Sequence, residues 1–244
     1  MPELSWLQWL IAITTAVFIG LAKTGIPGLS ILAIPLMAKY FPARASTGIV
    51  LPMLMCADLF AVTYYRRHAV WFHLFRLMPW TILGVVIGYL AMGRVNDAQL
   101  KPIIGIIILA IVGTNFLLSN RQEKSMPKSL WFAAGTGIAA GITTMMANAS
   151  GAIISIYFLA MQIPKTEFIG TSSWYYLILN WFKVPFSTSL GLITTESLQL
   201  AFTIFPAVAA GALFGIFILK HMAEKKFGII VQTLAAVTAV ELFI

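Results

Sequence analysis

Apolar runs recur along this chain from end to end, and no long polar stretch separates them. Of the 244 residues, 60% are hydrophobic and only 10% are charged, whereas soluble domains carry about 25% charged residues. A core surrounded by water could not hide so much apolar surface, so lipid must be the solvent for most of it. We therefore expect one integral membrane domain over residues 1–244, all-α and polytopic, with membrane lipid as a partner.

The formal net charge of +8 means something different here than in a soluble protein. In a soluble protein it would favour nucleic-acid binding, but here the basic residues fall in short loops, where they report membrane orientation. We expect no nucleic-acid partner. Only an acidic residue, Glu3, precedes the first apolar stretch, so that stretch predicts a retained helix rather than a cleaved signal peptide.

Polar residues, glycines and prolines divide the apolar sequence into ten candidate segments. Five lie on each side of the most hydrophilic stretch, residues 119–128, which predicts a linker between a first half (about 4–118) and a second half (about 129–244). In chain order, the segments lie at about residues 4–22, 29–40, 46–65, 74–92, 101–118, 129–145, 152–162, 168–185, 198–219 and 227–244.

The second segment of each half is too short to cross a bilayer upright. Each holds roughly a dozen residues, where a transmembrane helix needs about 20. Each follows a break in an apolar region, at residues 23–28 and 146–151. The sequence therefore predicts short or re-entrant broken helices at the same place in both halves.

Glycines, prolines and one acid–amide pair recur in the same order in the two halves, which predicts an internal repeat. An odd number of segments crosses the membrane in each half, whether or not the broken pair spans it, so the halves are expected to have opposite orientation. Such inverted repeats are common in transporters. At offsets of 122 to 127, the matched positions are Gly28 and Gly151, Pro42 and Pro164, Gly48 and Gly170, Asp58 and Asn180, Pro79 and Pro206, Gly84 and Gly211, and Gly88 and Gly215.

Basic residues in the loops predict the orientation of the chain. The loops after the third, fifth, seventh and ninth segments carry ten Lys and Arg residues, and those after the second, fourth and eighth carry five. The positive-inside rule places the richer set in the cytoplasm. Both termini are then expected outside it.

The two breaks are the best candidates for a binding site. Interrupted helices are tolerated at membrane depth only where they line a cavity or pack against protein. Helix amino termini there offer N–H groups and partial positive charge to an anion, and glycines let the backbone approach it closely, although the same glycines would also serve helix packing. The candidate contacts for a small anionic substrate are Lys23, Thr24, Gly25, Gly28, Ser30, Asn148, Ser150, Gly151 and Asn180.

Lys23 is the sharpest single candidate. It ends an apolar run, and a charge at the bilayer centre costs at least about 2.5 kcal/mol, so an ionisable residue there is a functional candidate. The alternative is an interfacial lysine whose ammonium reaches the headgroups. We expect Lys23 to contact the anion.

Asp58 and Asn180 form the acid–amide pair of the repeat, in the middle of their segments. Asp58 would either carry a coupling proton or form a structural ion pair with Lys23 or another base. Lys183 lies three residues after Asn180, on the same helix face; it would approach the site or mark the segment end near Pro185. We assign Asp58 and Lys183 to coupling or gating.

The first break also resembles a known family. The stretch from Gly20 to Gly28 (GLAKTGIPG), followed by Pro35, resembles the opening signature of the TauE/SafE sulfite exporter family. The resemblance covers nearly the whole chain, including both short second segments and the Asn180-x-x-Lys183 pair. It implies movement of sulfite, or an organosulfonate such as sulfoacetate, across a bacterial inner membrane.

The second break departs from that family pattern. Residues 147–151 read ANASG where the family usually has a glycine-rich loop, and Phe158 stands at the position that matches Pro35. The departure concerns the substrate contacts more than the fold. We expect a secondary transporter that works by alternating access, with no cofactor; the sequence assigns no oligomeric state.

Other function classes remain as alternatives. One is an anion channel, which measured flux per molecule would separate from a carrier. A second is an intramembrane hydrolase with Ser150 as nucleophile, but a serine needs a base within hydrogen-bond reach, and no histidine lies in a predicted segment. A lipid-phosphate phosphatase would need acidic and arginine residues at the breaks, which contain neither. Paired Cys and His ligands are absent from the sequence pattern, so we expect no metal site.

Overall fold

The computed structural model describes residues 4–27, 29–96, 98–99, 129–223, 226 and 230, and every regular element within them is helical. The expected fifth segment, the linker at 119–128 and nearly all of the expected tenth segment lie outside the described residues, as does Gly28. The elements are α1 (Trp6–Thr24), α2 (Ser30–Tyr40), α3 (Ala43–Tyr65), the 3-10 helix η1 (Arg66–His68), α4 (Trp71–Met92), α6 (Leu130–Ala147), α7 (Gly151–Ala160), α8 (Lys165–Ser189), α9 (Thr195–Thr203) and α10 (Phe205–His221).

Several of these helices are long and apolar enough to cross a membrane. Among the described residues they are α1, α3 continued through η1, α4 and α6, and the pair α9–α10 would add a fifth span that is bent by 51°. Large apolar side chains also lie exposed on the outside of the bundle, as lipid-facing residues must. Examples are Phe75, Trp131, Phe202 and Leu213. The prediction of an all-α, polytopic membrane protein is confirmed.

The expected ninth segment, 198–219, is not one helix. It divides into α9 and α10 at Ile204. Pro206 lies in the first turn of α10, and because proline has no backbone N–H and clashes with the preceding turn, a helix that continued through it would be broken or kinked. Its counterpart in the first half, Pro79, lies inside the continuous helix α4.

The two short second helices are present as predicted. Helix α2 has 11 residues and α7 has 10. Gly25 caps the end of α1 and Asn148 caps the end of α6, where its left-handed backbone (φ 54°) turns the chain towards α7. Asparagine adopts this conformation more readily than most residues. Asn148 therefore both ends α6 and sets the direction of the turn into α7.

Two helix pairs come together through glycines. In α4, a Cβ at Gly84 would lie 2.3 Å from a backbone oxygen of α6, and Gly141 of α6 approaches the backbone of α4 in the same way. In α10, a Cβ at Gly211 would lie 2.2 Å from the Val17 oxygen of α1. The repeated Pro-x4-Gly-x3-Gly pattern therefore packs α4 of the first half on α6 of the second, and α10 of the second half on α1 of the first.

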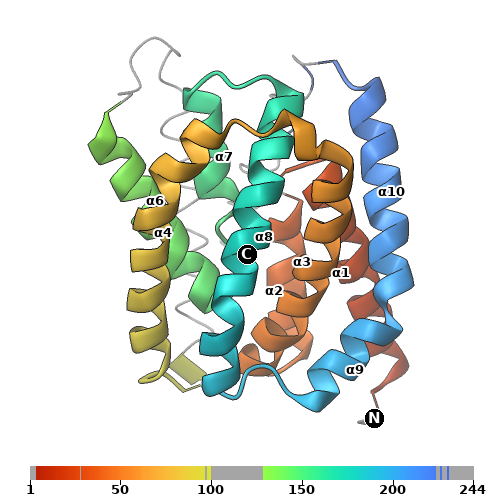
Figure 1. Ribbon diagram of the computed structural model, residues 1–244. Coiled ribbons are helices and arrows are strands. Elements are labelled where there is room, and N and C mark those ends of the chain that lie inside the picture. The colour runs from red at the N-terminus through yellow and green to blue at the C-terminus, as the bar shows by residue number, and fades with distance from the viewer. Residues whose placement is uncertain are drawn as a thin grey trace.

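Because α4 packs on α6 and α10 packs on α1, helices of the two halves are exchanged, and the described helices form two lobes. One apolar core is built mainly from α4, α6, α7 and α8, and the other from α1, α2, α3, α9 and α10. The lobes meet where α3 runs beside α8, with α8 at the front of Figure 1 and α10 beside α1 at one edge. The two helices that carry Asp58 and Asn180 thus form the centre of the lobe interface.

Candidate functional site

Lys23, near the end of α1, points into the bundle. Its side chain is only 9% exposed, and Nζ lies 2.7 Å from Oδ1 of Asp58 on α3, which is fully buried. The Lys23 ammonium also lies 3.7 Å from the centre of the Tyr176 ring on α8, within the range of a cation–π interaction. The lysine is therefore held in the interior and does not extend to a headgroup region.

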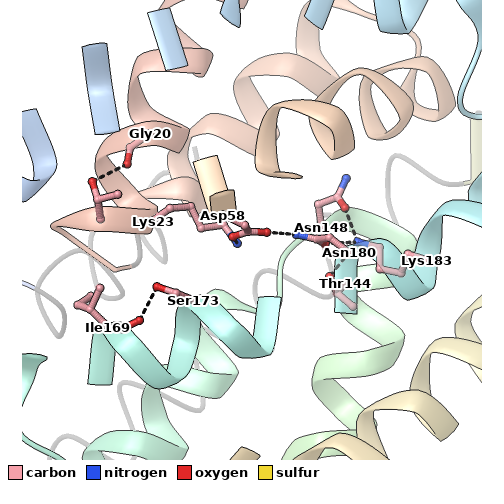
Figure 2. A network of polar contacts seen from close by, with 10 residues as sticks. Gly20, Lys23, Asp58, Thr144, Asn148, Ile169, Ser173, Asn180 and Lys183 are labelled. Carbon is pink, nitrogen blue, oxygen red and sulfur yellow. Dashed lines mark hydrogen bonds and ion pairs between the residues drawn. The ribbon is translucent and has the colours of Figure 1, made fainter. Parts of the chain in front are cut away.

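Asp58 and Asn180, the acid–amide pair found by offset, are in direct contact. Asn180 Nδ2 donates a hydrogen bond of 2.6 Å to Asp58 Oδ2. Both side chains are buried on facing helices. Asp58 therefore joins Lys23 of α1 to Asn180 of α8 across the lobe interface, as Figure 2 shows.

Lys183 extends the same network on its far side. Its ammonium is buried and donates to Asn148 Oδ1 (2.7 Å), Thr144 Oγ1 (3.1 Å) and Asn180 Oδ1 (3.3 Å). Helix α8 runs on to Ser189, with Pro185 inside it, so Lys183 does not mark the segment end. Interior prolines are tolerated in membrane helices because neighbouring groups satisfy the backbone.

Asn148 links the second break to the first half. Its amide accepts from Lys183 and donates through Nδ2 to the Thr47 carbonyl of α3 (3.1 Å). Because α6 ends at this residue, the turn, the lysine and α3 are fixed by one side chain. The network runs without interruption from Lys23 to Thr47.

The charges in this network do not balance. In their ordinary ionisation states, Lys23 and Lys183 are positive and Asp58 is negative, which leaves one positive charge. Among the described residues, Lys183 has only neutral oxygen partners. An ionisable group in the membrane interior is costly unless it is paired, so a bound anion would complete the charge balance.

A small cavity lies beside the network. Its volume is about 40 Å³, and one water molecule needs roughly 10–15 Å³ of such space, so the cavity has room for a few small polar groups. Six of the sequence-predicted contacts line it: Lys23, Ser30, Asn148, Ser150, Gly151 and Asn180.

The two breaks meet at this cavity. A Cβ at Gly151, the first residue of α7, would lie 3.5 Å from the Ser30 hydroxyl, at the first residue of α2. None of the described side chains caps the amino terminus of either helix. Two helix amino termini therefore lie at one cavity, an arrangement that favours negative charge.

Thr24 and Gly25 lie away from the cavity. Thr24 Oγ1 donates to the carbonyl oxygens of Gly20 (3.0 Å) and Ala212 (2.7 Å), and Gly25 packs against Gly215 of α10. In this conformation both fasten α1 to α10. Asp58 and Lys183 do not line the cavity either; they lie behind Lys23, Asn148 and Asn180.

Several lining residues did not emerge from the sequence. Ser172 and Ser173 of α8 face the cavity, and Thr144 and Ser155 add further hydroxyls. A signal was present in α8. Residues 172, 176, 180 and 183 are polar or aromatic at spacings of four, four and three, which places them on one helix face.

The chain was also compared with known proteins. The family model described as "Sulfite exporter TauE/SafE" matches residues 12–242. No curated protein and no solved structure matches the chain.

Proposed function

Since this chain belongs to the TauE/SafE sulfite exporter family, whose members are membrane transporters, we propose that it moves a small sulfur-containing anion across a bacterial inner membrane. The substrate class is sulfite or an organosulfonate such as sulfoacetate. The observation that carries the proposal is the presence of two buried lysines and one buried carboxylate in a network beside a hydroxyl-lined cavity where the lobes meet.

The cavity supplies the donors that a sulfur oxyanion requires. An ammonium, several hydroxyls and side-chain amides lie around it, and charge-assisted hydrogen bonds to anionic oxygens are stronger than neutral ones. Lys23, Asn148, Ser150 and Asn180 would contact the anion directly. Ser30 and Gly151 would present the amino termini of α2 and α7. Thr24 and Gly25 would hold α1 in place. A close backbone contact at Gly28 stays a prediction.

Alternating access fits the division into two lobes. The polar network crosses between α3 and α8, so rocking of one lobe against the other would open the cavity first to one side and then to the other. Asp58 and Lys183 would gate this movement, since they join the lobes through Asn180. The inverted repeat and the outward position of both termini belong to the same proposal.

Two other functions have weaker support. The small volume of the cavity, about 40 Å³, favours a carrier over a continuously open anion channel. A hydrolase would need a base beside Ser150, but among the described residues no histidine lines the cavity, and both buried lysines have other partners.

Flux into proteoliposomes tests the proposal. We expect saturable uptake of labelled sulfite or sulfoacetate by the wild type and its loss in Lys23→Ala, while Lys39→Ala, at an exposed position on α2, keeps normal flux. The double variant Lys23→Ala/Asp58→Asn serves as the folding control, because it removes both charges of the pair. Equal flux in wild type and the folded lysine variant would move the site away from Lys23. Product formation from a lipid or peptide would instead indicate an enzyme.

A further inference from the structure

Lys23 is already occupied by an anion that belongs to the protein. Its ammonium contacts Asp58 Oδ1, and no other described group makes an aligned hydrogen bond to that oxygen. Asp58 Oδ2 has its own donor, Asn180. An anion that enters the cavity and binds Lys23 would therefore share the ammonium with Oδ1 or take the place of that oxygen.

The charged and titratable groups around Asp58 determine whether it can stay ionised when Lys23 binds a substrate anion. Lys23 faces it from α1. From α8 come Asn180, Lys183 behind that amide, and Tyr176, whose ring lies under the Lys23 ammonium. Cys56 is the nearby titratable group on its own helix. Besides Asp58, no acidic side chain lies among these groups. If Lys23 turned to a substrate anion, an ionised Asp58 would be left beside that anion, with its Oδ1 deprived of its counter-charge.

Protonation removes this conflict. A proton on Asp58 Oδ1 makes the carboxyl neutral, frees the Lys23 ammonium and leaves Oδ2 to accept from Asn180. The site then holds two lysines and one substrate anion in place of two lysines and one carboxylate. For a monovalent anion its net charge is the same loaded and empty, so the lobe movement then carries the same buried charge in both directions. A proton without an anion would leave both lysines unbalanced.

We propose that Asp58 and the substrate anion exchange places on Lys23, so that one proton binds with each anion and the protein is a proton–anion symporter. This inference rests on the proposed transport function. Asn180, the repeat counterpart of Asp58, cannot carry a proton in this way. For a monovalent anion the cycle is electroneutral, and an acidic exterior drives uptake.

The experiment uses wild-type protein in proteoliposomes that contain a pH-sensitive dye. The first probe is a labelled alkyl sulfonate, because a sulfonic acid stays ionised at working pH and carries no proton itself. With the membrane potential clamped at zero, we expect protons to enter with the anion. Each unit of inward pH gradient should raise the accumulation ratio about tenfold, the equivalent of one pH unit of free energy. If only sulfite is transported, the proton count per anion is compared between wild type and Asp58→Asn.

Asp58→Asn should lose the accumulation driven by the pH gradient. Glu167→Gln, a partly exposed position at the start of α8, should behave as wild type. Wild-type counterflow without any response to pH, or a normal response in Asp58→Asn, overturns the symport inference and leaves transport standing. Absence of wild-type counterflow with every anion overturns the proposed function itself. The wild-type measurement decides even if the variant does not fold.

Discussion

The two breaks of the bundle carry different chemistry at matching places. At the first, α1 ends in a lysine that pairs with a carboxylate. At the second, Asn148 caps α6, and the lysine there lies on α8, with only neutral oxygens as hydrogen-bond partners among the described residues. The residue that matches Lys23 by offset is Met146. The first break therefore holds a charge that can be released from a partner, and the second holds a charge fixed in a cage of hydrogen bonds.

The largest test of this comparison replaces each lysine by methionine. Lys23→Met leaves Asp58 buried without its counter-charge, and removal of one partner of a buried pair costs about 3–5 kcal/mol. Lys183→Met leaves no ion unpaired and only strands oxygen acceptors, which costs about 1–3 kcal/mol. The free energy of unfolding, measured by detergent titration, should rank the two in that order.

The double variant Lys23→Met/Asp58→Asn should recover most of the stability lost in the single lysine variant. Lys39→Met, on the exposed end of α2, is the matched control. Equal losses for Lys23→Met and Lys183→Met would show that the two breaks do not differ in charge pairing.

A second test compares the two glycine interfaces. An added Cβ at Gly141 or Gly211 would meet a backbone oxygen at 2.2 Å, and overpacking of this kind typically costs about 1–3 kcal/mol. Gly135, on the same helix as Gly141, has nothing within 4 Å of such a Cβ. We expect Gly141→Ala and Gly211→Ala to lower the unfolding midpoint and Gly135→Ala to leave it unchanged. A similar loss in all three would point to helix flexibility rather than close packing.

A third test makes the second break resemble the first. Asn148→Asp gives Lys183 a carboxylate and brings the net charge of the network to zero. We expect stability to be kept and anion affinity to fall about tenfold or more, a change of at least ~1.4 kcal/mol. Equilibrium binding of labelled anion would measure it, with Asn148→Gln as the neutral comparison. Unchanged affinity in the aspartate variant would mean that the excess charge does not attract the substrate.

The smallest effect concerns Thr24. The sequence predicts it as a ligand contact, but in the structure its hydroxyl donates a hydrogen bond to the Ala212 carbonyl oxygen. Thr24→Val should cost about 1 kcal/mol of stability through one lost hydrogen bond, with anion affinity unchanged. Thr24→Ser keeps the hydroxyl and should have the stability of the wild type. Weaker binding at full stability would instead make Thr24 a direct contact.

The sequence predicted most of what depends on local pattern. Hydropathy located the described helices and the two short ones, and the offset of 122 paired Asp58 with Asn180 before their contact was known. The division at Ile204 could have been expected from Pro206, whose ring ends one helix and starts the next. The depth of Lys183 could not, because nothing in its own segment shows that Thr144 and Asn148 of another helix lie beside it.

The sequence did not predict which helices make up each lobe either. Gly84 and Gly211 were visible as members of a repeated pattern, but the pattern does not name the partner helix. Only the folded chain shows that each glycine helix packs on the first helix of the opposite half. The serines of α8 were present as a polar helix face, and they were overlooked because single hydroxyls in an apolar segment usually bond to their own backbone, as Ser173 does.

The exchange of helices between halves also sets an order of assembly during synthesis. Thr24 and its acceptor Ala212 are 188 residues apart, so α1 emerges from the ribosome long before the helix that will cover it. Helices α4 and α6 are much closer along the chain, so their lobe can close first. Asp58, only 35 positions after Lys23, arrives early enough to neutralise it. The ion pair that later holds the site closed would thus also shelter a bare charge in the bilayer while the protein is still being made.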